Sequence, residues 1–153
     1  MSSKKVLILY YSGSGNTKRM AKAIVEAMKS SAINVTVEDV GESDISLLPK
    51  YDSIVLGSPT YFSNVAWQVK KVIDESIVHY SGGKLKGKVA GIFTSAGTSR
   101  DGKDCLKMLE IALGIHHGMK VVEGILRVDG ENDKEVEKRC QGYGKKLVKE
   151  IEK

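Results

Sequence analysis

The sequence lacks the features of membrane and secreted proteins. No apolar run in its 153 residues approaches the length that crosses a membrane. Residues 1–5 lead directly into an apolar strand, so we expect no signal peptide and no membrane partner. The two cysteines, Cys105 and Cys140, lie far apart in helical patterns. They are typical of buried thiols in a reducing compartment rather than of a disulfide or metal pair, so we expect a cytoplasmic protein.

Nucleic-acid motifs are absent as well. The formal net charge is +5, but much of the excess lies on lysines of helix faces such as Lys145, Lys146 and Lys149. Aromatic residues are not interleaved with these lysines, and such a run of charge is typical of a solvated helix face. We therefore expect no nucleic-acid partner, although a basic chain attracts acidic partners and anionic cofactors.

Clustered catalytic groups are also missing. No Cys/His/Asp nucleophile pattern stands out. The adjacent His116 and His117 cannot share one face of a helix, so they are a poor metal pair and we expect no metal. A structural role at a helix end and a functional role both stay open for them. A phosphorylation-receiver domain is excluded, because the first and third strands end in Tyr10–Ser12 and Gly57–Ser58 instead of clustered carboxylates.

The chain does have a regular alternation of strands and helices. Apolar patterns predict strands over residues 6–12, 35–40, 53–57, 89–95 and 121–128. They predict helices over 17–30, 65–78, 105–113 and from about 133, with at most a short helix over 44–48. No repeat, low-complexity segment or linker interrupts this pattern, so we expect a single domain over residues 1–153. The predicted fold class is α/β, with a five-stranded parallel sheet in the order 2-1-3-4-5 and helices on both faces.

The loop after the first strand is suited to a phosphate. In the predicted order the chain reverses between strands one and three, and ligands bind at the carboxyl ends there. This first loop, Ser12–Thr17, contains two glycines and four side chains that donate hydrogen bonds, and a helix begins at its end. It lacks the lysine of a P-loop, and the dinucleotide fingerprint would need a glycine in place of Lys18. A plain turn between strand and helix stays the alternative.

Two further loops follow strands that lie next to the first. The second loop, Ser58–Asn64, carries Tyr61, which we expect to contact a ligand. We expect Trp67, one helical turn later, to pack inward over the sheet. The third loop, Thr94–Gly102, is small and polar, and its N–H and hydroxyl groups are suited to the polar edge of a heterocyclic ring. An ordinary flexible loop is the alternative.

These motifs together resemble a known family. The first loop resembles the FMN-phosphate loop of flavodoxins. The chain as a whole is more similar to the flavodoxin-like NAD(P)H:quinone oxidoreductases called tryptophan-repressor-binding proteins. The matching segments span nearly the full chain in the family's order; they are Tyr10–Ser12, Gly57–Thr60, Phe62, Asn64, Gln68, Asp74, Phe93–Thr98 and His116–Met119.

The resemblance implies a flavodoxin-like three-layer sandwich that binds FMN non-covalently. It assigns the phosphate to Ser12, Gly13, Ser14, Gly15, Asn16 and Thr17. It assigns the isoalloxazine ring to Pro59, Thr60, Tyr61, Phe62, Ser63 and Asn64. It assigns the pyrimidine edge of the ring to Ser95, Ala96, Gly97, Thr98, Ser99 and Arg100. It also implies a catalytic histidine near the flavin, often from a neighbouring subunit, which we place at His117.

The resemblance implies two functions. One is a reductase that passes electrons from NAD(P)H through FMN to a quinone or similar acceptor; the other is a flavodoxin carrier between redox partner proteins. The third loop lacks the aromatic residue of flavodoxins, and this and His117 favour the reductase, whereas the chain length and the Ser12–Thr17 loop favour the carrier. In many flavodoxins a glycine in the second loop flips its peptide bond and so stabilises the one-electron-reduced semiquinone. The matching place here is about Phe62, where a positive φ would be costly for a bulky residue, so we expect a poorly stabilised semiquinone and mostly two-electron chemistry. The chain lacks the long insertions of the quinone reductases, which in that family help to build the tetramer. Whether this chain forms a homo-oligomer therefore stays an open question.

Overall fold

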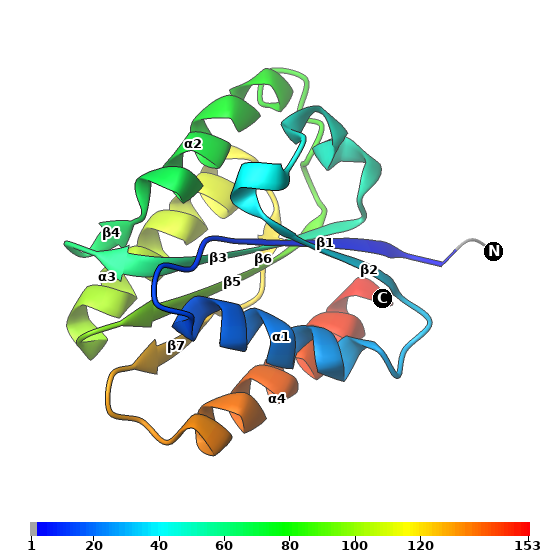
Figure 1. The fold of residues 1–153 in the computed structure, drawn as a ribbon. Coiled ribbons are helices and arrows are strands. Elements are labelled where there is room, and N and C mark those ends of the chain that lie inside the picture. Colours follow the sequence, from blue (N-terminus) through cyan, green and yellow to red (C-terminus); the bar gives the residue numbers. More distant parts are fainter. Residues whose placement is uncertain (1–2) are drawn as a thin grey trace.

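The protein, described here by a computed structural model over residues 3–153, has three layers. A twisted sheet lies between two pairs of helices, with α1 and α4 on one face and α2 and α3 on the other (Figure 1). Met1 and Ser2, on which part of the signal-peptide expectation falls, lie outside the described residues. Within 3–153 we find no helix that combines the length and the apolarity needed to span a bilayer.

The helices and strands alternate as expected. The strands are β1 (Lys5–Tyr10), β2 (Asn34–Asp39), β3 (Ser53–Tyr61), β4 (Asn64–Val65), β5 (Val89–Ala96), β6 (Lys120–Val121) and β7 (Ile125–Val128). The α-helices are α1 (Asn16–Met28), α2 (Trp67–Glu75), α3 (Ser99–Glu110) and α4 (Asp133–Ile151). Shorter helical turns are η1 (Val40–Glu42), η2 (Ile45–Lys50), η3 (Ser76–His79) and η4 (Ile111–His116).

The sheet order confirms the predicted topology, except that the last strand is divided into two. The strands run β2-β1-β3-β5, and both β6 and β7 pair parallel with β5 at the next position. The predicted fifth strand is therefore present as two pieces. The remaining strand, β4, pairs antiparallel with the end of β3 and was not predicted.

The two faces of the sheet form two separate cores. Side chains alternate along β1, because successive residues of a strand point to opposite faces. Val6 and Ile8 pack with α1 and α4, whereas Leu7 and Leu9 pack with α2 and α3. On the first face the two helices approach closely at Gly144, where an added Cβ would lie 2.6 Å from the carbonyl oxygen of Ile24. Burial on both faces explains the near-continuous apolar run that marked this strand in the sequence.

Two predicted boundaries were wrong. The third helix begins at Ser99, not at Cys105, because the Thr98 side chain caps it by accepting a hydrogen bond from the Asp101 N–H. Gly102 lies inside that helix, where an added Cβ would come within 2.2 Å of Leu126, so this glycine serves close packing rather than loop flexibility. The third strand continues past Gly57 to Tyr61, because its end pairs with β4.

A tyrosine hydroxyl fills the break between β6 and β7. The Tyr143 hydroxyl accepts a hydrogen bond from the Ile92 N–H (3.0 Å) and donates one to the Val122 carbonyl (2.9 Å). It thus connects β5 to the edge segment where the strand ladder is interrupted. Tyr143 is 3 % exposed, and burial raises the pKa of its hydroxyl. At the interruption, the absence of a side chain on Gly124 lets the backbone pack directly against Ile92 of β5, since a Cβ there would lie 2.7 Å from the Ile92 side chain.

Replacing Tyr143 by phenylalanine tests this bridge. The change leaves a buried N–H and a carbonyl without their partner, so we expect the free energy of unfolding to fall by about 1–3 kcal/mol. Denaturant unfolding measures it. The matched control is Tyr51→Phe, because the Tyr51 hydroxyl has no hydrogen bond among residues 3–153. Equal stability of the two variants would contradict the bridging role.

Candidate cofactor site

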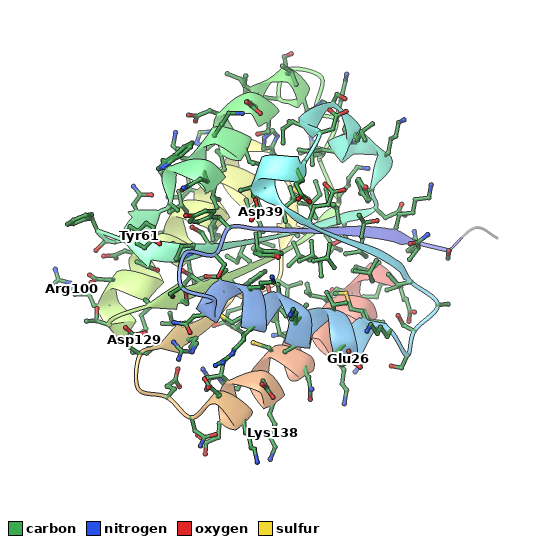
Figure 2. All side chains as sticks on the ribbon, in the orientation of Figure 1. Glu26, Asp39, Tyr61, Arg100, Asp129 and Lys138 are labelled. Carbon is green, nitrogen blue, oxygen red and sulfur yellow. The ribbon has the colours of Figure 1, made fainter. Side chains whose placement is uncertain are left out.

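The three loops meet at the carboxyl edge of the sheet. The Thr17 hydroxyl of the first loop hydrogen-bonds the Ser95 hydroxyl of the third (2.9 Å). The Tyr61 hydroxyl of the second loop lies against the first, since a Cβ on Gly13 would be 2.5 Å from it. Figure 2 shows Tyr61 at the same end of the molecule as Arg100 of the third loop. The predicted neighbourhood of the three loops is therefore present.

The first loop forms a cradle of N–H groups at the start of α1. Gly15 takes a left-handed backbone with φ 103°, which glycine adopts without strain. The Ser12 hydroxyl accepts hydrogen bonds from the N–H groups of Gly15 (3.1 Å) and Lys18 (3.2 Å), which closes the loop. Within residues 3–153, five backbone N–H groups of this loop have no partner; they belong to Ser12, Gly13, Ser14, Asn16 and Thr17.

This cradle suits an anion. The unpaired N–H groups coincide with the positive end of the α1 dipole, and the first turn, Asn16–Arg19, contains no acidic residue. Thr17 is 1 % exposed and its hydroxyl is held by Ser95, so it shapes the floor of the loop. The Ser12 hydroxyl keeps its own proton free to donate, because both of its hydrogen bonds are accepted ones.

The second loop is a tight hairpin with an unusual backbone. Tyr61 pairs with Asn64 across a two-residue turn formed by Phe62 (φ 51°) and Ser63 (φ 63°). Both values lie in the left-handed region, where Asn-Gly is the usual pair and a bulky residue is strained. Phe62 adopts a positive φ despite its size, so the cost of that conformation no longer indicates two-electron chemistry.

Buried hydroxyl groups hold the base of this hairpin. The Thr94 hydroxyl donates to the Ser58 carbonyl (2.6 Å) and therefore accepts from the Thr60 hydroxyl (2.7 Å). The Ser58 hydroxyl donates to the Pro59 carbonyl (2.8 Å) and accepts from the Ala66 N–H (2.9 Å). These contacts fix the end of β3 against β5. Only the outer part of the loop is then left exposed.

The outer part of the second loop presents aromatic side chains. Tyr61 is 47 % exposed, as a ligand-contacting residue needs, and Phe62 is fully exposed. Trp67 was expected to pack inward, but 71 % of it is exposed. It is the first residue of α2, where the backbone has just left the hairpin and the sheet side is already covered by Val65 and Ala66.

The third loop is divided between a buried and an exposed part. Ser95 and Ala96 are buried at the end of β5. The following residues are exposed; they are Gly97, Thr98, Ser99 and Arg100. Ser99 and Arg100 belong to the first turn of α3, so only Gly97 and Thr98 connect strand to helix. Without an aromatic side chain, this loop leaves the neighbouring edge open.

Comparison with known proteins shows which family has this arrangement of strands and loops. The family model of the flavodoxin domain matches residues 7–119. The chain belongs to the flavodoxin domain family.

Relatives of the domain include proteins named NAD(P)H dehydrogenase (quinone) and solved flavodoxins. The chain is 34 % identical over 164 residues to an NAD(P)H dehydrogenase (quinone) of Rhizobium rhizogenes, covering 94 % of this chain and 82 % of that one. A flavodoxin, WrbA-like protein from Agrobacterium tumefaciens has a TM-score of 0.85 at 26 % identity, with 98 % of both chains covered. A flavodoxin from the domain Archaea has a TM-score of 0.84 at 26 % identity, with 97 % and 99 % covered. The resemblance read from the sequence is thereby confirmed.

His117 lies at the other end of this flavodoxin domain. It precedes β6, whose Lys120 pairs with Val89, the first residue of β5, whereas the loops follow Ala96. At ~3.3 Å per residue this separates them by about 20 Å. The His117 Nε2 is 2.8 Å from the Ser76 hydroxyl, and the ring is buried. The structure does not bring His117 to the loops of its own chain, and a role at a neighbouring subunit's site stays a prediction.

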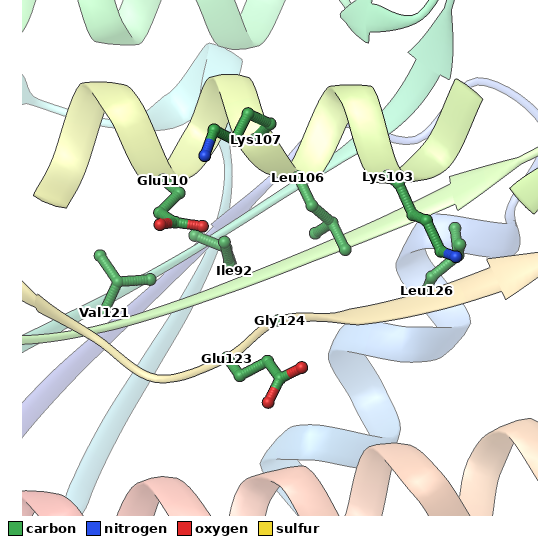
Figure 3. A pocket seen from close by; sticks show the side chains of 9 residues that line it. All are labelled: Ile92, Lys103, Leu106, Lys107, Glu110, Val121, Glu123, Gly124 and Leu126. Carbon is green, nitrogen blue, oxygen red and sulfur yellow. The ribbon is translucent and has the colours of Figure 1, made fainter. Parts of the chain in front are cut away.

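Two hollows of the flavodoxin domain lie away from the three loops. One, of about 560 Å³, lies between α3 and the broken edge strand (Figure 3); its walls include Leu106, Lys107, Glu110 and Gly124. The other, of about 540 Å³, lies between α2 and α3 and includes His117. Neither touches the first or second loop, so neither is part of the cofactor cradle.

Sequence analysis missed Asp101 as part of the site. Its carboxylate accepts a hydrogen bond from the Ser63 hydroxyl (2.8 Å), which joins the second loop to α3. The signal was present, because an acidic residue three positions after Thr98 is the pattern of a helix start. It was overlooked because the helix was expected to begin only at Cys105.

The buried His117 predicts a pH dependence of stability. Burial, together with the neighbouring His79 and His116, lowers the pKa of His117. The unfolded chain therefore binds more protons than the folded chain between that lowered pKa and the ordinary value of about 6.5. We expect the free energy of unfolding to fall as the pH drops below about 6.5, and His117→Gln to flatten this profile. Urea unfolding from pH 5 to 8 measures it; Lys84→Gln, at an exposed position, is the control. A profile unchanged by His117→Gln would contradict the assignment.

Proposed function

We propose that this flavodoxin domain is an oxidoreductase that passes electrons from NAD(P)H through non-covalent FMN to a quinone or similar acceptor. The observation that carries the proposal is the cradle of unpaired N–H groups at Gly13–Thr17, beside a third loop that leaves the edge open. The relatives named NAD(P)H dehydrogenase (quinone) support the donor and acceptor classes.

The three loops divide the binding of FMN among them. The first loop receives the phosphate on its N–H groups and on the hydroxyls of Ser12 and Ser14. The second loop flanks the ring with Tyr61 and Phe62, and the third offers its backbone to the polar edge. Bound FMN would supply the hydride and electron-transfer chemistry. The chain supplies position, the exclusion of water from one face and a positive local field.

A flavodoxin carrier is the second candidate. It is supported by the almost complete overlap with solved flavodoxins and by the exposed Phe62 and Trp67 beside the loops, which suit a redox partner protein. Under either function the proposal treats residues 1–153 as one FMN-binding domain in the cytoplasm. The two buried free cysteines, Cys105 and Cys140, fit such a reducing compartment.

Ser14→Ala tests the phosphate assignment. The Ser14 side chain is exposed and makes no hydrogen bond among residues 3–153, so its removal leaves the fold intact. We expect FMN affinity to fall by about tenfold, the cost of one hydrogen bond to a charged group. Riboflavin, which has no phosphate, is expected to bind both proteins equally. Fluorescence titration measures both ligands, with Ser81→Ala as control at an exposed position far from the loops. Equal losses for FMN and riboflavin would contradict the assignment.

Anaerobic mixing with NADH and with NADPH separates the two functions. We expect rapid bleaching of the flavin absorbance of the FMN-loaded protein, followed by recovery on adding a quinone. The physical reason is that the third loop puts no aromatic side chain over the edge of the site. Absence of bleaching, together with ready reduction by a protein reductase, would make the protein a carrier. Failure to retain FMN would overturn both functions.

A further inference from the structure

The turn at the tip of the second loop is held in a costly conformation. Phe62 and Ser63 both have positive φ, and β4, the strand that the turn leads into, is only two residues long. A hairpin of this length is not stable by its own pairing. Something outside the hairpin must therefore stabilise the turn, since strained residues persist only where their surroundings over-determine them.

One contact from outside reaches the strained residues. The Ser63 hydroxyl donates to Asp101 Oδ1 at 2.8 Å, and the contact is half-buried. Asp101 is itself held, because its N–H donates to the Thr98 hydroxyl (3.2 Å) at the start of α3. Among the ion pairs of residues 3–153 none involves Asp101, so its carboxylate is not engaged by a cation.

We infer that Asp101 is a positioning residue that clamps the Phe62–Ser63 turn and thereby sets the orientation of Tyr61 and Phe62. A carboxylate is a strong acceptor for the Ser63 hydroxyl, and the first turn of a helix is a rigid place from which to offer it. The effect on FMN rests on the proposed function. The clamp itself is a property of the chain without FMN.

If Asp101 had a simpler role, variants of Ser63 and Asp101 would behave differently from what the clamp requires. An acidic residue in the first turn also stabilises a helix through its dipole, without any part in the hairpin. If that were its whole role, Ser63→Ala would leave the hairpin unchanged. Asp101→Asn would then destabilise α3 nearly as much as Asp101→Ala, because both remove the charge. The clamp instead requires that Ser63→Ala act like Asp101→Ala, and that Asp101→Asn, which keeps an acceptor oxygen, be close to wild type.

The experiment compares hydrogen exchange and flavin binding across these variants. In the full chain without FMN, we expect Asp101→Ala and Ser63→Ala each to speed exchange of the amides of residues 61–65 by about tenfold, the effect of losing one such hydrogen bond. The double variant should be no faster than either single one, because both remove the same contact. Asp101→Asn should restore slow exchange. Asp104→Ala, an exposed acidic residue on the same helix, is the control.

Flavin binding separates this inference from the proposed function. With FMN and with riboflavin, we expect the two alanine variants to weaken binding equally for both ligands, because the clamp acts on the ring-flanking loop and not on the phosphate. Wild-type exchange rates in both Ser63→Ala and Asp101→Ala would overturn the clamp while leaving FMN binding intact. Failure of the wild type to bind FMN would overturn the proposed function, and the exchange result would still decide the clamp.

Discussion

The packing of Phe93 over Gly57 is the contact on which the site depends. The Phe93 ring occupies the space of a side chain at position 57, since a Cβ on Gly57 would lie 2.1 Å from it. These two residues pair directly across β3 and β5, and Gly57 also pairs with Tyr10 of β1. At this level β1 ends, whereas β3 and β5 continue to Tyr61 and Ala96. Backbone pairing sets the spacing of these strands, and the buried ring fills the sheet face between them, close to where hydroxyls of different loops come within hydrogen-bond distance.

The site that results offers neutral donors to an anion. Its N–H groups are fixed by the turn at Gly15 and by the start of α1, so they need little reorganisation when a phosphate enters. Of the charged side chains nearby, Lys18 is exposed and Arg19 is paired with Asp133 (2.7 Å), so the attraction they exert on an anion is long-range and screened by salt. The chain's net charge of +5 therefore acts on the rate of encounter with anionic ligands, while the loop backbone determines the geometry.

Local pattern was enough to predict the layers and the first loop, because both follow from burial and glycine spacing along the chain. Periodicity indicated β1 and α4 correctly, including the buried Cys140 and Tyr143. It failed where tertiary contacts decide. The broken edge strand depends on a hydroxyl from α4, and the positive φ at Phe62 depends on contacts with distant segments. The outward position of Trp67 follows from a hairpin that no local pattern indicated, since its turn lacks the usual Asn-Gly pair.

The second and third loops differ in how firmly they are held and in the side chains that they expose, and this difference bears on function. The second loop is pinned at its base by hydroxyl contacts to Thr94 and near its tip by Asp101, and it presents Phe62 to solvent. The third is short and offers no large side chain beyond Ala96 until Arg100. A planar ring between them would be covered on one side and open on the other. An open side admits a nicotinamide, and an exposed aromatic beside it also suits a protein surface. Whether the protein acts as a reductase or as a carrier therefore depends on whether a nicotinamide or a partner protein reaches the flavin first. The uncovered third loop favours the smaller reductant, the nicotinamide.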